Sequence, residues 1–436
     1  MKIKIVSLQK VLIAGVVFGA LLCAGVYFPL INFSPAFMIL LLINGLFLIA
    51  NWFTNKGKIL FEPELKKTVY SIGIMIISSL VALLINGYGL NDGFVLIVMS
   101  FLLGISVYET ISSSDDIQFY LNFYVIISAV SALVQIGQVL HISFCYDIWK
   151  LLQQGDAVEH YATVNRYLGL SSNLINFSLQ ISAAYTIVLT TKYEKKFWRV
   201  LKYPLLILFA VSVWMSETRS GMIAILLVSL IAFLQYTKKK ENRLIKILVI
   251  VFAMICIVIA YDYFMVIMYG SRLFTAVGTK GTLARVPMFF TAINHAFHYP
   301  LGMGVYYVRP EYIIDSGGYY SEVLNNAAHN LFANCVASYG WIAVVALVAF
   351  YVEVFKAYLA SRKIADKRLS EQINTAILCV VALLISSLTH NKYILNGDFS
   401  AHIFISIVLS IYKLTKEVDY HESGSEDSVE DSSEVL

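Results

Sequence analysis

The sequence has few charged residues, and it lacks the common motifs for metal and nucleotide binding. Charged side chains make up 14% of its 436 residues, whereas a soluble domain carries about 25%. There is no Walker A loop, no HExxH motif and no Cys/His cluster with metal-ligand spacing. The five cysteines imply no disulfide framework, because most of them lie in apolar runs. The low content of charged residues excludes an ordinary soluble domain. Because the metal and nucleotide motifs are missing, we expect neither a metal ion nor a cofactor.

Long apolar runs are abundant instead. Hydrophobic residues make up 59% of the chain, and its mean hydropathy is +0.74. Runs of about 18 to 22 residues, long enough to cross a bilayer as helices, recur along the whole length. We therefore predict an all-α, polytopic integral membrane protein with about twelve transmembrane helices. They are expected near residues 11–31, 36–53, 69–86, 93–110, 118–140, 173–190, 203–216, 221–236, 245–268, 338–358, 372–388 and 399–414.

The distribution of Lys and Arg predicts the orientation of these helices. Cytoplasmic connections of membrane proteins carry an excess of Lys and Arg. With the N-terminus inside, 24 of the 32 basic residues fall in cytoplasmic segments and eight fall outside. Both termini are therefore predicted to be cytoplasmic, and the net charge of +4 needs no nucleic-acid partner to account for it. The connection at 109–118 contains no Lys or Arg, so the rule gives no orientation for its hairpin.

This topology gives a single transmembrane domain at residues 1–416, with large extracytoplasmic loops at about 141–172 and 269–337. The second loop is a long polar interruption in an apolar chain. Ordered loops of this length usually serve a function, so we expect it to roof a site at the outer face of the membrane. The tail at 417–436 is acidic, Ser-rich and without an apolar pattern. It is predicted to be disordered in the cytoplasm.

Three arginines in the outer connections lie in or beside apolar sequence: Arg166, Arg219 and Arg285. An Arg near hydrocarbon is costly and usually has a partner or a task. A guanidinium binds phosphate oxygens with a planar fork of donors. The three arginines together therefore favour an anionic substrate. For Arg219 the alternative is a side chain that snorkels to the interface or pairs with Glu217.

His329 precedes Asn330 where the outer loop meets the tenth apolar run. A neutral imidazole can accept a proton from a hydroxyl near neutral pH, which suits a general base. The alternative is a histidine at a helix start that caps the helix or faces water. The His-Asn dipeptide recurs at residues 390–391. Composition alone does not rank His329 above the other histidines on or near the outer side, which are His295, His298, His390 and His402.

Four short elements follow one another between about residues 160 and 360. The elements are Arg166-x-x-Gly169 with Asn173; Thr218-Arg219-Ser220-Gly221; Arg285 with Pro300-Leu301-Gly302-Met303-Gly304; and His329-Asn330-Leu331-Phe332 with Tyr339-Gly340-Trp341-Ile342. Their order and spacing resemble the O-antigen polymerase and O-antigen ligase superfamily, the Wzy-like enzymes of bacterial surface-polysaccharide assembly. Three positions depart from the family pattern: Ser172 stands where Pro is usual, Ala284 where Gly is usual, and Ala343 or Val344 where a second Gly is common.

The resemblance implies metal-independent glycosyl transfer on the outer face of the bacterial cytoplasmic membrane. The donor would be a glycan on undecaprenyl pyrophosphate, and the acceptor a sugar hydroxyl on another lipid-linked repeat unit. The resemblance also suggests a flippase and a chain-length regulator of the same pathway as partners, besides the lipid bilayer. In this interpretation the catalytic residues are His329 and Arg219, and the substrate-binding residues are Arg166, Arg285, Asn330 and Ser220.

Three functional hypotheses follow. The first is a polysaccharide polymerase that joins repeat units, which we prefer because the chain shows no separate acceptor-binding domain. The second is a ligase of the same superfamily that moves finished glycan to another acceptor. The third is a non-enzymatic flippase or transporter, which predicts internal repeats and ionisable groups near mid-membrane. The acidic residues of the outer loops form no DxD-like pair, so a metal-dependent sugar transferase is not supported.

Overall fold

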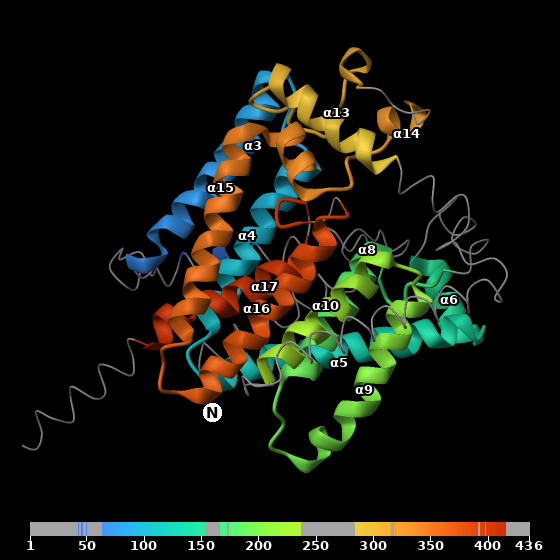
Figure 1. Cartoon of the computed structure of the whole chain (residues 1–436), viewed down its shortest axis with the longest axis vertical. Helices are drawn as coiled ribbons and strands as arrows, with labels where there is room; N and C mark the ends of the chain where they lie inside the picture. Colours follow the sequence, from blue (N-terminus) through green and yellow to red (C-terminus); the bar gives the residue numbers. More distant parts are fainter. Residues whose placement is uncertain are drawn as a thin grey trace, which may run out of the picture.

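The computed structural model of the chain is built from helices (Figure 1). It describes residues 63–152, 166–171, 174–236, 284–314, 318, 320–390, 393–396 and 398–415, together with residues 42, 45, 46 and 49. The predicted spans at 11–31 and 245–268, most of the span at 36–53 and the acidic tail at 417–436 lie outside the described residues.

No strand occurs in the described ranges, so the predicted all-α class is confirmed for them. Two short 3-10 helices also occur, η1 (Pro63–Leu65) and η3 (Pro310–Tyr312). The α-helices are α3 (Lys66–Ile85), α4 (Asp92–Thr110), α5 (Ser114–Val139), α6 (Ser143–Leu152), α8 (Leu174–Thr190), α9 (Lys196–Met215), α10 (Arg219–Tyr236), α13 (Arg285–His298), α14 (Tyr320–Asn325), α15 (Leu331–Ser361), α16 (Lys367–Ser387) and α17 (Phe399–Leu409).

Six helices of the described residues are long and apolar enough to cross a membrane, and three shorter apolar helices accompany them. These helices occupy the positions of nine predicted spans, from 69–86 to 221–236 and from 338–358 to 399–414. The total of twelve spans and the side on which the termini lie stay predictions. The six are Pro63–Ile85, Gly93–Thr110, Ser114–Val139, Lys196–Met215, Leu331–Ser361 and Lys367–Ser387, and the three are Leu174–Thr190, Arg219–Gln235 and Phe399–Thr415.

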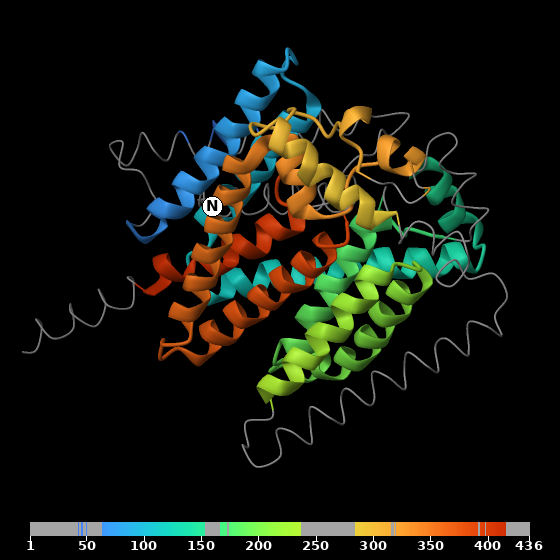
Figure 2. The same ribbon diagram turned by 45° about the horizontal axis from the view of Figure 1, so that its top comes forward.

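The helices pack as two groups that meet at α16. On one side α15 packs against α3, and α17 against α4; on the other, α8 packs against α5, α9 and α10. Helix α16 contacts both α8 and α17, and Figure 2 shows it between the two groups. Small residues allow close approach, as in other membrane helices. A Cβ on Gly221 of α10 would lie 2.0 Å from the Ser178 hydroxyl of α8.

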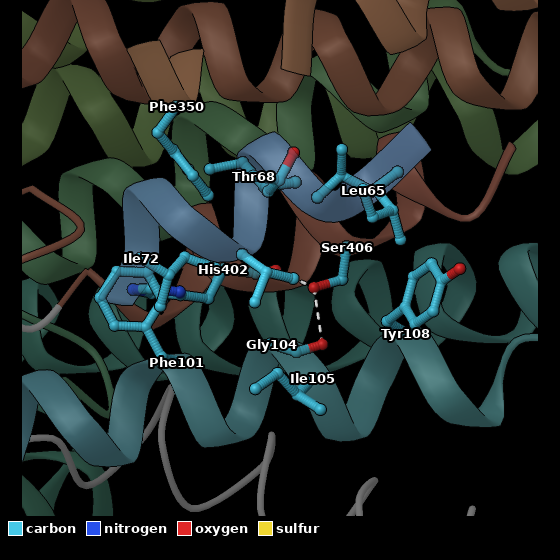
Figure 3. Close-up of a pocket in the computed structure, with 13 residues that line it drawn as sticks. Leu65, Thr68, Ile72, Phe101, Gly104, Ile105, Tyr108, Phe350, His402 and Ser406 are labelled. Atoms are coloured by element: carbon cyan, nitrogen blue, oxygen red, sulfur yellow. Dashed lines mark hydrogen bonds between the residues drawn. The ribbon is translucent and has the colours of Figure 1, made fainter. Parts of the chain in front are cut away.

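A largely apolar pocket lies among α3, α4, α15 and α17 (Figure 3). Two of its polar side chains are hydrogen-bonded within the protein. His402 Nε2 lies 2.9 Å from the Ile394 carbonyl, and the Ser406 hydroxyl donates to the Gly104 carbonyl at 2.7 Å. The pocket therefore presents mainly hydrocarbon to whatever adjoins it. It involves none of the arginines singled out in the sequence.

One end of the bundle gathers segments that the sequence predicts to be cytoplasmic. Arg368, at the start of α16, donates to Asp115 at 2.8 Å, and Lys192 after α8 pairs with Glu371. The connection at 109–118, which carries no Lys or Arg, therefore lies at the same end as the basic segments around residues 192 and 368. Because α16 begins at this end, its last residues and the loop after it lie at the opposite end.

Candidate active site

The Arg166 element is fixed to α5 by a glycine. Gly169 has φ +58°, and a Cβ there would lie 2.2 Å from the Ser131 carbonyl oxygen. The Gln138 side chain binds both backbone groups of this residue: Gly169 N–H donates to Oε1 at 3.0 Å, and Nε2 donates to the Gly169 carbonyl at 2.7 Å. Only glycine fits this conformation and contact, which explains the spacing Arg-x-x-Gly.

The side chain of Arg166 extends from this segment to the turn between α9 and α10. Its Nε donates to the Ser216 carbonyl at 3.3 Å, and its Nη2 to the Glu217 carbonyl at 3.0 Å. Arg219 is the first residue of α10, two positions after the second of these carbonyls. Two of the three arginines are therefore brought to one short turn, although they lie more than fifty residues apart in the chain.

A break in α15 holds the outer loop in place. Gly340 has φ +83° and ψ 177°, which are not helical values. The segment 300–304 enters at this point and takes over hydrogen bonds that a continuous helix would make internally. Three bonds join the two segments: Met303 N–H to the Ala337 carbonyl (3.1 Å), Gly304 N–H to the Ser338 carbonyl (2.7 Å) and Trp341 N–H to the Pro300 carbonyl (3.0 Å).

Asn330 caps α15 and ties it to α16. Its Oδ1 accepts the backbone N–H groups of Phe332 at 2.9 Å and Ala333 at 3.2 Å, and its Nδ2 donates to the Leu388 carbonyl at 3.0 Å. Its observed contacts are therefore structural, and the substrate-orienting role expected for it stays a prediction. The tie places His329, just before α15, beside the loop that follows α16.

Two histidines and a serine meet at this point. The rings of His329 and His390 lie 6.0 Å apart, centroid to centroid, with an interplanar angle of 86°. His390 Nε2 lies 2.7 Å from the hydroxyl of Ser220 on α10, and this contact is buried. The cluster thus joins the first turn of α10 to the start of α15 and the end of α16.

Burial and the neighbouring arginines keep both imidazoles uncharged. Burial lowers the pKa of His329 to about 4, helped by the charge of Arg285. Burial also lowers the pKa of His390 to about 3, with contributions from Arg285, His329 and Arg166. The pKa of Arg285 is itself lowered by burial and by the charge of Arg219. Arg285 is the first residue of α13, and its charge disfavours protonation of both imidazoles.

The arrangement combines positive charge with neutral bases. Arginine side chains can bind phosphate oxygens, and a neutral imidazole can accept a proton or donate a hydrogen bond. Three nitrogens in the cluster are buried and have no hydrogen-bond partner among the described residues: Arg285 Nε, His329 Nδ1 and His390 Nδ1. Among the described residues, no group of three or more His, Cys, Asp or Glu side chains is arranged to hold a metal ion.

The sequence pointed to His329 and the three arginines, and the structure brings them into one region. Their chemical roles stay predictions. The sequence analysis left His390 among the unranked histidines. The signal that would have singled it out is the second His-Asn dipeptide, which directly follows an apolar helix as the first directly precedes one.

Residues 204–348 match the Wzy_C family model, described as O-Antigen ligase. This match confirms the resemblance to the O-antigen polymerase and ligase superfamily. It spans the Arg219 turn, Arg285, the 300–304 segment and His329, whereas the Arg166 element and His390 lie outside it. No curated protein matches the chain. The family match indicates glycosyl transfer of the O-antigen polymerase or ligase type by a multi-pass membrane protein.

Proposed function

We propose that this protein is a polysaccharide polymerase that joins lipid-diphosphate-linked repeat units at the outer face of the bacterial cytoplasmic membrane. The observation that carries the proposal is the cluster of half-buried Arg285 and His329 with buried His390, beside the turn that holds Arg166 and Arg219. A diphosphate leaving group needs positive charge, and an attacking hydroxyl needs a base. The cluster offers both, and the family match supports a glycosyl-transfer function.

In the proposed reaction, the oxygen of an acceptor hydroxyl attacks the anomeric carbon of the donor sugar. A glycosidic C–O bond forms, the bond between that carbon and the diphosphate oxygen breaks, and its electron pair leaves with the diphosphate. His329 takes the hydroxyl proton and later releases it to water. The arginines stabilise the charge that develops on the leaving group.

Donor binding would also strengthen His329 as a base. Arg285 helps to lower the pKa of His329 to about 4 in the protein alone. A bound diphosphate places negative charge beside Arg285 and offsets its effect, because an opposite charge nearby favours protonation of the imidazole. His329 then becomes able to accept a proton when the donor is in place. The same charge balance favours the arginines as binding groups for the diphosphate.

The cluster distinguishes the polymerase from a transporter, whereas the polymerase and the ligase would share it. A transporter without chemistry would not need a neutral histidine among arginines at one end of the bundle. A ligase would use the same cluster, and the description of the matching family model favours it. The polymerase and the ligase differ in the acceptor, so the experiment must report which glycan accumulates.

The test is the size distribution of surface polysaccharide in cells that carry His329→Ala or Arg285→Ala, with protein level measured in the same cells. His298→Ala is the matched control, because this histidine is exposed on α13 and lies outside the cluster. Loss of a general base lowers a rate by about 10²–10⁴-fold. We expect single repeat units on the lipid carrier. Full-length polymer retained on the carrier would indicate the ligase, and unchanged surface polymer would refute an enzymatic role for the cluster.

A further inference from the structure

One ring nitrogen of His390 makes a hydrogen bond, and the other makes none with the described residues. Its Nε2 contacts the Ser220 hydroxyl at 2.7 Å, whereas its Nδ1 is buried and has no hydrogen-bond partner in the part of the chain that the structure describes. His390 itself is 9% exposed. Buried polar atoms are almost always hydrogen-bonded, so an unpaired one needs an explanation, and a catalytic role is one such explanation. Two further buried nitrogens without a hydrogen-bond partner among the described residues, on Arg285 and His329, belong to the same cluster.

We propose that His390 is a further substrate-contacting residue, whose Nδ1–H donates a hydrogen bond to a diphosphate oxygen of the donor while Ser220 holds the ring in position. This inference rests on the proposed function, because it assigns His390 to the leaving group of that reaction. His390 would add a neutral hydrogen-bond donor to the charged donors of the arginines. No covalent step at His390 is involved.

Burial and the neighbouring charges keep the ring of His390 neutral, and the contact with Ser220 bears on which nitrogen carries the hydrogen. The charges of Arg285 and Arg166 and the ring of His329 all disfavour a protonated imidazole at residue 390. A neutral ring carries a hydrogen on one nitrogen only. If the Ser220 hydroxyl donates to Nε2, the hydrogen lies on Nδ1. That tautomer suits an anion, because the oxygens drawn in by the arginines are acceptors.

The position of Ser220 makes this ring a rigid donor. Ser220 is 4% exposed and lies in the first turn of α10, next to Arg219. The following residue, Gly221, packs against α8 so closely that a Cβ would meet the Ser178 hydroxyl at 2.0 Å. The hydroxyl that orients His390 is therefore fixed by helix packing. A donor held in place before the reaction stabilises a developing charge without reorganising.

Two substitutions at residue 390 separate substrate contact from a purely structural role. In His390→Asn the side-chain amide replaces Nδ1 and loses the reach to Ser220. In His390→Gln the amide replaces Nε2, keeps that reach and leaves no donor at the Nδ1 position. Removing one preorganised donor to a developing anion costs about 10²–10³-fold in rate. We expect His390→Gln to lose about 100-fold in polymerisation rate and His390→Asn to lose about 10-fold or less.

The rates are measured with purified full-length protein in detergent, beside His329→Ala, Arg285→Ala and the exposed control His298→Gln. Binding of inorganic pyrophosphate is measured by calorimetry on the same preparations, so that binding is read without turnover. We expect His390→Gln to bind pyrophosphate about 10-fold more weakly than the wild type, while His298→Gln binds it unchanged.

The outcomes separate this inference from the proposed function. If His329→Ala and Arg285→Ala lose activity while His390→Gln matches the wild type, the proposed function stands and the role of His390 is refuted. If His390→Asn loses more activity than His390→Gln, His390 only positions Ser220, and the inference is again refuted. If both variants lose activity, weaker pyrophosphate binding supports the contact and unchanged binding refutes it. Unchanged activity in every variant would refute the proposed function itself.

Discussion

Gly340→Ala tests whether the break in α15 holds the outer loop. A Cβ at residue 340 would lie 2.4 Å from the Pro300 carbonyl oxygen and 2.5 Å from the carbonyl carbon of Leu301. Both are backbone atoms, which cannot rotate away. The substitution must therefore displace the 300–304 segment, and it also places a side chain at φ +83°.

The cost has two parts. A non-glycine residue in this backbone region costs about 1–3 kcal/mol. Displacing the segment breaks three backbone hydrogen bonds, each of which contributes about 0.5–1.5 kcal/mol. We therefore expect the free energy of unfolding to fall by about 2.5–7.5 kcal/mol. Polymerisation should be lost as well, because His329 lies two residues before the segment of α15 that the loop holds.

Two control glycines separate these contributions. Gly318 has φ +87° but no atom within 4 Å of its Cβ position, so Gly318→Ala reports strain alone. Gly73 lies within α3, also with nothing within 4 Å, so Gly73→Ala should be stabilising by about 0.5–1 kcal/mol. Thermal and denaturant unfolding of the purified proteins measures all three variants. A Gly340→Ala protein no less stable than Gly318→Ala would refute the proposed lock between the two segments.

Two further predictions concern the cluster. Arg285→Gln removes a charge that lowers the pKa of His329. The imidazole acts as a base only above its pKa, so the acid limb of the kcat/KM profile should move up from near pH 4 toward the ordinary pKa of histidine. An unmoved limb would show that the charge of Arg285 does not act on the pKa of His329. Asn330→Ala removes a helix cap worth about 0.5–2 kcal/mol and the bond to Leu388. We expect lower stability with lower kcat, and full activity in a destabilised Asn330→Ala protein would show that the tie does not position His329.

The helices and the short motifs could be predicted from the sequence, because both depend on local composition. An apolar run of sufficient length predicts a helix, and the described residues contain helices at nine of the twelve predicted positions. The turn at Arg219 and the glycine after Arg166 were also visible, since both keep a fixed local spacing. The structure adds the reason for Gly169, whose conformation and contact with α5 exclude a side chain.

Contacts between distant segments could not be predicted in this way. The pairing of residues 300–304 with the break at Gly340 depends on backbone bonds between two segments far apart in the chain. The role of Asn330 as a cap depends on where α15 begins, ahead of the predicted start of the apolar run at 338. His390 was overlooked because its partner Ser220 lies 170 residues away. Helix α13 lies within what the sequence presented as one long loop.

The interruption of α15 also divides the helix into two mechanical units. Ala337 and Ser338, before Gly340, accept hydrogen bonds from the 300–304 segment, and Trp341, after Gly340, donates one to it. A membrane helix tilts when the bilayer thickness differs from its hydrophobic length. Because the 300–304 segment is bonded on both sides of Gly340, we expect tilt of the part after the break to be passed to this segment as well as to residues 331–339. We therefore expect a change in bilayer thickness to reach His329 through the same bonds.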